Sequence, residues 1–353
     1  MALDIVLLVI GLALLVKGAD WFVDGGAGTA RLCKISPLVI GLTVVAFGTS
    51  MPELAVSVTS AIQKSTDIAI GNVVGSNIVN ILLILGLSAL MHDLPVQKDS
   101  LKLDLPVLLL ASVLIIGLGY WGSALQWWDG LIMLAVFAGY MFVLLRTAMK
   151  KQRLLKAEGV LSDALPGSPE AAEGEIAAQS EISEEQKSAL SFGKRAKLWY
   201  RKMSDKKWFL ILLIAVGLGM VVGGGTLLVN SARDIAERFG VSERIIGLTI
   251  VAIGTSLPEL VTSVVAALKK ETDIAVGNVI GSNIFNVFVV AGVSSLFYPL
   301  AFTTGNLIDA CVALGAAAVL YLLALFKGHK LGKFAGVFMI LCYAGYFVYL
   351  FTA

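Results

Sequence analysis

The chain alternates long apolar stretches with short polar segments over nearly its whole length. Each stretch holds about 20 mostly apolar residues, the length that a helix needs to cross the hydrocarbon core of a bilayer. Ten such stretches begin near Leu3, Pro37, Asp67, Leu105, Leu125, Trp208, Ile245, Asp273, Leu307 and Phe334. The pattern predicts an all-α polytopic membrane protein with ten transmembrane helices.

A long polar segment at residues 150–207 divides these helices into five and five. It separates a first five-helix half, residues 1–149, from a second half, residues 208–353. Its stretch 158–185 carries eight acidic residues and no Lys or Arg, and basic clusters flank it. We interpret the segment as a solvated linker with basic ends at the anionic leaflet. A regulatory cation sensor or a partner site is the alternative, but no EF-hand loop pattern is present.

The two halves contain the same 50-residue sequence, at 41–90 and at 247–296. The offset is constant at 206, there is no gap, and 30 of the 50 positions are identical. The identical positions include polar residues, such as Glu53 and Glu259. A requirement for hydrophobicity alone would not have retained them. Corresponding helices lie five apart in order, so the two copies cross the membrane in opposite directions. The sequence therefore predicts two inverted-topology five-helix repeats, an arrangement found in secondary transporters.

Composition and charge agree with a membrane location. The chain is 58% hydrophobic and 15% charged, whereas soluble domains carry about 25% charged residues. If the N-terminus lies outside, 22 of the 27 Lys and Arg residues fall in inside loops. The positive-inside rule then places both termini outside and the 150–207 linker in the cytoplasm. We expect the protein to lie in the cell (inner) membrane. The first apolar stretch lacks a basic leader, so we interpret it as a helix and not a signal peptide.

Two carboxylates interrupt apolar runs at equivalent places. Glu53 lies within the run 37–62, and Glu259 lies at the matching point of the second copy. A carboxylate at bilayer depth costs several kcal/mol unless it is paired or faces a polar cavity. Polar residues that only pack helices together are usually Ser, Thr or Asn. Two symmetric Glu residues therefore indicate a functional site.

The residues before each Glu suit a hard cation, which prefers carboxylate, hydroxyl and carbonyl oxygens. Thr49 and Ser50 precede Glu53 at helical spacing, so their hydroxyls lie on its side. Pro52 lacks an N–H and, with a nearby glycine, predicts a broken helix at mid-membrane. We expect the break to free carbonyls such as that of Ala46 to face an ion. The second copy repeats these features at Ala252, Thr255, Ser256 and Pro258.

The next helix of each copy supplies more oxygens. Ser76 and Asn80 are four residues apart and share one face, and Ser282 and Asn286 repeat the pair. GxxxG spacings at 71–75 and 277–281 predict close helix approach. We expect Glu53 and Glu259 to meet near the midplane, surrounded by Thr49, Thr255, Asn80 and Asn286.

Charge and missing groups narrow the chemistry. Two ionised carboxylates give a charge of about −2, which one Ca²⁺ or two Na⁺ ions would neutralise. No Lys or Arg near the site would hold an anion, and no aromatic cage would hold an organic cation. A cation channel is an alternative, although pores usually combine several subunits. An intramembrane enzyme is a poor fit because the repeat has no His or Cys. We expect no cofactor, no nucleic acid and no protein partner beyond the lipid bilayer.

The motifs GTSxPE and GSNxxN, present in both halves, resemble the α-repeats of the Ca²⁺/cation antiporter superfamily. The nearest branch is that of the prokaryotic sodium/calcium exchangers. This resemblance implies exchange of several Na⁺ for one Ca²⁺, by sliding of helices one and six past a fixed core. The related Ca²⁺/H⁺ antiporters are the alternative, in which protons titrate the same carboxylates.

The resemblance also implies a set of ligands. Calcium would bind Glu53, Glu259, Thr49 and Thr255. Sodium would use the side chains of Ser50, Ser256, Ser76, Ser282, Asn80 and Asn286 and the carbonyls of Ala46 and Ala252. Some archaeal and K⁺-dependent members have Asp at the position of Asn286. This departure argues against K⁺ dependence.

Overall fold

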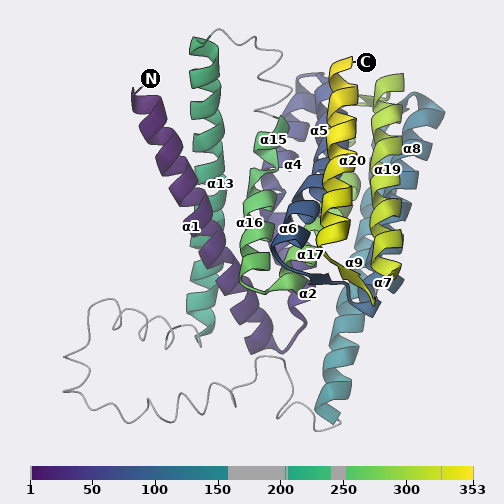
Figure 1. The fold of residues 1–353 in the computed structure, drawn as a ribbon. Coiled ribbons are helices and arrows are strands. Elements are labelled where there is room, and N and C mark those ends of the chain that lie inside the picture. Colours follow the sequence, from purple (N-terminus) through teal and green to yellow (C-terminus); the bar gives the residue numbers. More distant parts are fainter. Residues whose placement is uncertain (1, 158–202, 204–205, 240–251, 327, 353) are drawn as a thin grey trace.

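The computed structural model describes residues 2–157, 203, 206–239, 252–326 and 328–352, and it is almost entirely helical (Figure 1). The first half contains α1 (Ala2–Cys33), α2 (Pro37–Ile40), η1 (Gly41–Val45), α3 (Ala46–Thr49), α4 (Met51–Ile62), α5 (Thr66–Ile78), η2 (Val79–Leu85), α6 (Gly86–Met91), α7 (Lys98–Lys102), α8 (Asp104–Gly122) and α9 (Trp127–Ala157). The second contains α13 (Lys207–Arg238), α15 (Ala252–Thr255), α16 (Leu257–Leu268), α17 (Thr272–Phe285), η5 (Asn286–Ala291), α18 (Gly292–Phe297), α19 (Thr304–Leu325) and α20 (Lys333–Thr352).

Eight helices among the described residues are long and apolar enough to cross a membrane. A ninth span results if α2–α3 and α4, bent by 45° at the break, are counted together. Their starts agree with the predicted ones to within three residues, except that the span predicted near Leu105 begins at Lys98, because the short α7 precedes α8. The predicted start of the seventh span near Ile245 and the acidic part of the linker lie outside the described residues.

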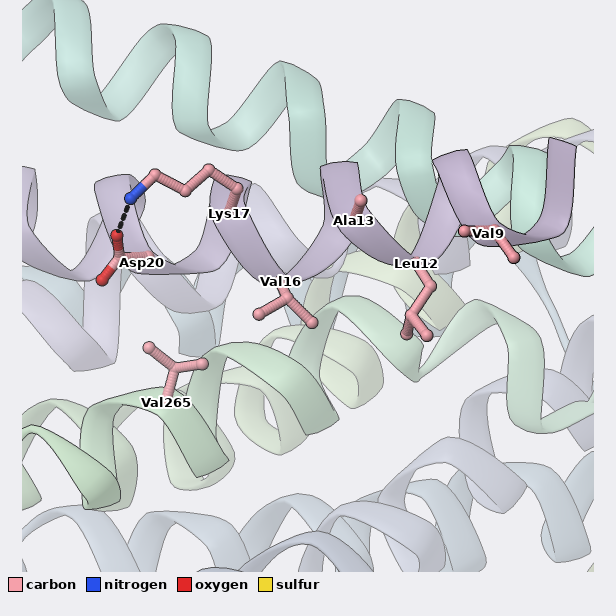
Figure 2. Close-up of a pocket in the computed structure, with 7 residues that line it drawn as sticks. All are labelled: Val9, Leu12, Ala13, Val16, Lys17, Asp20 and Val265. Atoms are coloured by element: carbon pink, nitrogen blue, oxygen red, sulfur yellow. Dashed lines mark hydrogen bonds and ion pairs between the residues drawn. The ribbon is translucent and has the colours of Figure 1, made fainter. Parts of the chain in front are cut away.

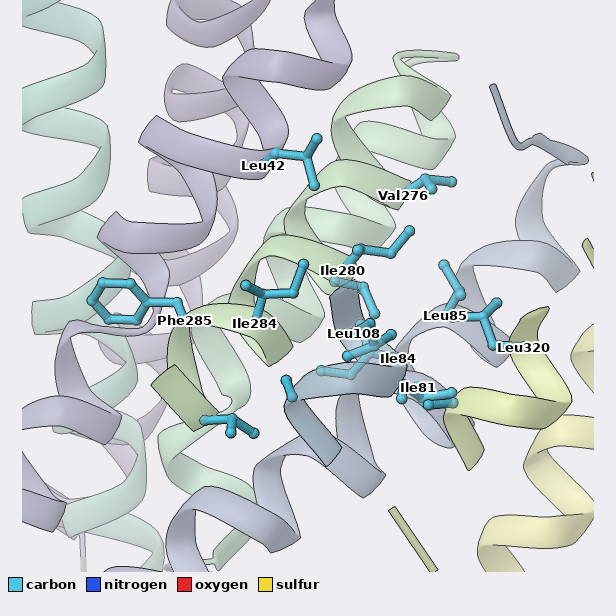
Figure 3. Packing of buried hydrophobic residues seen from close by; sticks show 14 of the residues in the cluster. Leu42, Ile81, Ile84, Leu85, Leu108, Val276, Ile280, Ile284, Phe285 and Leu320 are labelled. Carbon is cyan, nitrogen blue, oxygen red and sulfur yellow. The ribbon is translucent and has the colours of Figure 1, made fainter. Parts of the chain in front are cut away.

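The two repeated helices form the centre of the protein. One continuous helix runs through α5, η2 and α6, and 78% of the residues in its most apolar stretch are buried. In its counterpart from α17 to α18 the share is 94%. Large aliphatic side chains fill the space around the crossing, as Figure 3 shows for Ile81, Ile84, Ile280 and Ile284. Their buried Ser and Asn side chains require polar partners that lipid cannot supply, which accounts for the central position of these helices.

The α1 and α13 helices form an antiparallel pair held by backbone contact (Figure 1). Glycines at Gly11, Gly18 and Gly25 of α1 recur every seven residues, and Gly217 and Gly224 of α13 lie at the repeat offset of 206. A Cβ added at Gly18 would lie 2.8 Å from the Gly217 carbonyl oxygen. Such small residues let membrane helices pack tightly without large side chains.

One part of the α1–α13 pair packs outside the main core. Leu15, Ala19 and Val221 form a small buried cluster that contacts Leu257 and Val261 of α16. An open, largely apolar groove of about 540 Å³ runs along α1 beside α16 (Figure 2). Its lining comprises Val9, Leu12, Ala13, Val16, Lys17, Asp20 and Val265.

Charged residues tie α1 to the α16–α17 corner. Lys269 Nζ lies 2.6 Å from Asp20 Oδ1 and 2.6 Å from Asp24 Oδ1. Nearby, Arg31 contacts Glu271 at 3.4 Å. Burial raises the pKa of Glu271 above its ordinary value, and the guanidinium of Arg31 opposes that shift. These contacts connect the two halves at the end of α1.

Two short antiparallel strand pairs join the halves. Strand β1 (Leu94–Pro95) pairs with β4 (Lys330–Leu331), and β2 (Ala124–Leu125) pairs with β3 (Leu300–Ala301). The two pairs are related by the offset of 206, because Leu94↔Leu331 maps onto Leu300↔Leu125. All four leucines are fully buried. Each half therefore completes the other at two places.

Candidate functional site

A break in one helix of each half creates the frame of the site. Ser50 has φ −85° and ψ 8°, and Ser256 has φ −88° and ψ 6°, so both leave helical geometry at the same place. Pro52 and Pro258 follow in the first turn of α4 and α16, where a missing N–H costs no helical hydrogen bond. The predicted broken helices are thus present, and each begins a new helix N-terminus inside the protein.

The carboxylates of Glu53 and Glu259 lie in these first turns and are completely buried. The partial positive charge of a helix N-terminus stabilises a carboxylate there. Each also accepts a hydrogen bond from the opposite half: Ser50 Oγ donates to Glu259 Oε1 at 2.8 Å, and Ser256 Oγ donates to Glu53 Oε1 at 3.2 Å. Each carboxylate therefore lies against the broken helix of the opposite half. That the two Glu residues meet around an ion at the midplane stays a prediction.

Two asparagines that we did not predict connect the halves again. Thr49 Oγ1 donates to Asn278 Oδ1 at 3.1 Å, and Thr255 Oγ1 donates to Asn72 Oδ1 at 3.3 Å. Both asparagines are identical between the repeats, in the GNV sequence of each copy. The repeat comparison alone could have identified them, because they are polar and retained like the residues that we selected.

Four further asparagines form a ring where α5–η2 crosses α17–η5. Asn77 and Asn283 each donate to the other's backbone carbonyl at 3.2 Å. Asn80 Nδ2 donates to Asn283 Oδ1 at 2.9 Å, and Asn286 Nδ2 donates to Asn77 Oδ1 at 3.2 Å. The ring fixes the orientation of the Asn80 and Asn286 side chains, because each amide nitrogen donates a hydrogen bond to another asparagine of the ring. The oxygens of Asn80 and Asn286 are therefore left without a donor.

The buried oxygens that lack a partner identify what the site requires. Glu53 Oε2, Glu259 Oε2, Asn80 Oδ1 and Asn286 Oδ1 are all buried and accept no hydrogen bond. A buried acceptor without a partner costs about 1–3 kcal/mol, and more when it is charged. Among the described residues neither Glu forms an ion pair with Lys or Arg. In the described part of the chain, no positively charged side chain therefore neutralises these oxygens.

Backbone irregularity accompanies the ligands. The helices change to a wider π-helical turn at Val79 and at Asn286, so Asn80 and Asn286 of the ring lie within these turns, and η1 lies just before Ala46. Such turns are rare and occur frequently at functional sites. The local sequence gave no sign of them, because each stretch is simply apolar.

The remaining predicted residues are placed as follows. Ser76 Oγ lies 3.2 Å from Ser256 Oγ and can donate to it, and Ser282 Oγ donates to the Ala46 carbonyl at 3.5 Å. The expectation that the Ala46 carbonyl is freed is wrong, because Ser50 N–H still donates to it at 3.0 Å. The bend occurs at Ser50 itself, so the preceding helical bond is kept. Ala252 is the first described residue after 240–251.

In chemical terms, the site consists of carboxylate, hydroxyl and amide oxygens. Hard cations such as Ca²⁺ and Na⁺ prefer this class of ligand. No cluster of three or more His, Cys, Asp or Glu residues suited to a metal ion occurs in the described part of the chain. The hydrogen bonds described above bring together two carboxylates and neutral hydroxyl and amide oxygens, and their role as ion ligands stays a prediction.

Comparison with known proteins agrees with this chemistry. The family model described as "Sodium/calcium exchanger protein" matches residues 3–146 and 209–352. The "Sodium/calcium exchanger MaX1" of Methanosarcina acetivorans is 33% identical over 99% of this chain and 98% of its own length. The "Inner membrane protein YrbG" of Escherichia coli is 36% identical over 85% of this chain and 81% of its own.

A solved structure has the same fold. The sodium-calcium exchanger NCX_Mj, soaked with zero Na⁺ and Ca²⁺, superposes with a TM-score of 0.77 at 31% identity, over 99% of both chains. The resemblance noted from the two motifs thus extends over both halves. The chain is a multi-pass membrane protein that belongs to the sodium/calcium exchanger family.

Proposed function

We propose that this protein exchanges Na⁺ for Ca²⁺ across the inner membrane at a midplane site built on Glu53 and Glu259. The observation that carries the proposal is the set of four buried, unpartnered acceptor oxygens on two Glu and two Asn side chains. One Ca²⁺ would neutralise the two carboxylates, and two Na⁺ ions would do the same. The names of the relatives, MaX1 and NCX_Mj among them, support these two ions.

We assign Ca²⁺ to the two Glu residues together with Thr49 and Thr255. Sodium would use the neighbouring neutral oxygens, namely those of Ser50, Ser256, Ser76, Ser282, Asn80, Asn286 and the carbonyls of Ala46 and Ala252. The hydrogen bonds from Ser50 and Ser256 to the two Glu carboxylates support the inclusion of these hydroxyls in the site.

The topology that we propose has ten spans in two inverted halves, with both termini outside and the linker inside. The strand pairs support it independently of charge. The β1–β4 pair joins the segment after the third span to that after the ninth, and β2–β3 joins those after the fourth and eighth. Two strands that pair must lie on the same side of the membrane, so an even number of spans must separate them along the chain. With ten spans this number is six for β1–β4 and four for β2–β3.

For transport, we propose that the α1–α13 pair moves as a unit past the core. The glycine contacts hold the two helices together, whereas α1 borders an open apolar groove towards α16 (Figure 2). A smooth apolar surface of this kind gives little resistance to sliding. Movement of the pair would expose the site alternately to either side, as alternating access requires.

The coupling ion is tested with purified protein in proteoliposomes. Vesicles are loaded with Na⁺, K⁺ or choline at equal pH, and uptake of ⁴⁵Ca²⁺ is followed; a second series applies a proton gradient. We expect uptake to require internal Na⁺. Uptake driven by the proton gradient alone would instead establish the Ca²⁺/H⁺ alternative.

The site is tested with Glu53→Gln and Glu259→Gln. Removing one member of a buried charge interaction costs about 3 kcal/mol or more, roughly a hundredfold in affinity. We therefore expect almost no Ca²⁺ uptake from either variant at micromolar Ca²⁺. Asp99→Asn is the matched control, because that carboxylate is exposed, lies outside the repeat and pairs with Lys151 instead of the site residues. Near-normal uptake by both Glu variants would refute the site.

A further inference from the structure

Asn72 and Asn278 occupy equivalent positions and each touches three groups. Asn72 Nδ2 donates to the Glu53 carbonyl at 3.1 Å and to Ser57 Oγ at 2.9 Å, while its Oδ1 accepts from Thr255 at 3.3 Å. The amide thus joins a peptide group of α4 to a hydroxyl of α15. These elements belong to different halves of the protein.

The second half repeats the arrangement with its partners exchanged. Asn278 Nδ2 donates to Ser263 Oγ at 2.8 Å and to the Glu259 carbonyl at 3.5 Å, while Oδ1 accepts from Thr49 at 3.1 Å. Asn278 is fully buried, and Asn72 is half-buried. Each bridge therefore connects one half's Glu to the other half's Thr.

The chemistry of the bridge requires an amide. Only a carboxamide offers donors and an acceptor on one rigid planar group. The Thr hydroxyl has a single proton, for which the carbonyls of Val45 and Ala46 compete with the Asn278 amide oxygen at Thr49. When the proton is donated to the amide oxygen, the lone pairs of the hydroxyl remain for a cation. The same amide holds the peptide that carries the Glu side chain. The distance between two ligands on different halves is thereby fixed by one small group.

We propose that Asn72 and Asn278 are positioning residues that set the spacing of the Glu and Thr ligands, and with it the selectivity for cation size. This inference rests on the proposed Ca²⁺ site. Rigid ligand spacing discriminates between cations of equal charge and different radius, whereas a flexible cage accepts larger ions. Loss of the bridge lets the two broken helices separate, so the site favours a larger ion than Ca²⁺.

The test measures ⁴⁵Ca²⁺ uptake by Asn72→Ala and Asn278→Ala, with unlabelled Ba²⁺ as a competitor. A single buried hydrogen bond contributes about 1–1.5 kcal/mol, so we expect the KM for Ca²⁺ to rise about tenfold. Inhibition by Ba²⁺ should change less, so the ratio of Ba²⁺ to Ca²⁺ affinity increases. A purely structural role would lower the amount of active protein and leave this ratio unchanged. Asn278→Ser replaces Asn278→Ala if the latter is not monodisperse.

A double-mutant cycle identifies the partner across the halves. In a Thr49→Val background, Asn278→Ala should raise the KM for Ca²⁺ by a smaller factor than in the wild type, because the contact with Thr49 is already lost and only those with Ser263 and the Glu259 carbonyl remain to be removed. In a Thr255→Val background the same substitution should have its full effect, which provides a matched control. Asn72→Ala should show the opposite pattern. Equal effects in both backgrounds would refute the bridge.

The results separate this inference from the site on which it rests. If Thr49→Val and Thr255→Val leave the KM for Ca²⁺ unchanged, both the ligand assignment and the bridge are wrong. If they raise the KM while the Asn variants change neither the KM nor the Ba²⁺ ratio, only the positioning role is overturned. A higher KM with a raised Ba²⁺ ratio supports both.

Discussion

The contact between α1 and α13 leaves no room for a side chain at two positions of α13. A methyl group at Gly217 would lie 2.7 Å from Phe22 N, and one at Gly224 would lie 2.6 Å from Leu15 N. Carbon atoms in good contact are about 3.5–4.0 Å from their neighbours, so either Ala would push the helices apart by about 0.7 Å or more. Backbone atoms cannot rotate away as a flexible side chain can.

This separation has a cost that can be estimated. A gap of 0.5–1 Å removes a quarter to a half of the dispersion energy of the contacts along the interface, and overpacking costs typically about 1–3 kcal/mol. Helix pairs in lipid lack a hydrophobic driving force and depend on this packing. We therefore expect Gly217→Ala and Gly224→Ala each to destabilise the protein by about 2 kcal/mol.

The same helix provides matched controls. Gly219 and Gly223 have no described heavy atom within 4 Å of an added Cβ, and Ala is favoured over Gly in a helix by up to about 1 kcal/mol. The assay is thermal unfolding in detergent, followed by the monodisperse fraction on size exclusion. Gly219→Ala and Gly223→Ala should melt at or above the wild-type temperature. Identical melting temperatures for all four variants would refute the proposed backbone contact.

Two other substitutions test the site and the ion pairs. Asn286→Asp places a third carboxylate beside the site, and we expect it to change which monovalent cation supports ⁴⁵Ca²⁺ uptake while expression stays normal; unchanged ion dependence would place Asn286 outside the site. Lys269→Met removes the cation between two aspartates of α1 and should lower stability by about 1 kcal/mol at low ionic strength. That loss should shrink in concentrated choline chloride, which screens charge, and the exposed Lys270→Met should show none of it.

Much of the fold was predictable because the membrane restricts the choices. Apolar length located the spans, and the constant offset between the copies located the two equivalent Glu residues. The break after Thr49 followed from Pro52, whose missing N–H is a strictly local property. These features depend on single residues or on short segments, which sequence shows directly.

The features that could not be predicted from the sequence depend on contacts between the two halves. Nothing in the sequence around Asn72 shows that its amide reaches Thr255, 183 positions away. Likewise, the heptad of glycines acquires meaning only when α13 lies antiparallel against α1. The prediction that the Ala46 carbonyl is free was wrong for a local reason. A shift of one residue in the position of the bend decides whether the hydrogen bond from Ser50 N–H survives.

The four unpartnered oxygens also bear on what the protein does when no ion is bound. A carrier that changes sides must pass through a state in which its site is closed to water. With two buried carboxylates and no counter-ion, that state carries the desolvation cost of uncompensated charge. An empty site would therefore stay on the side where it released its cargo until a replacement cation arrived. If these oxygens bind the exchanged ions as we propose, they also prevent a futile leak, and exchange is obligatory without any separate gate.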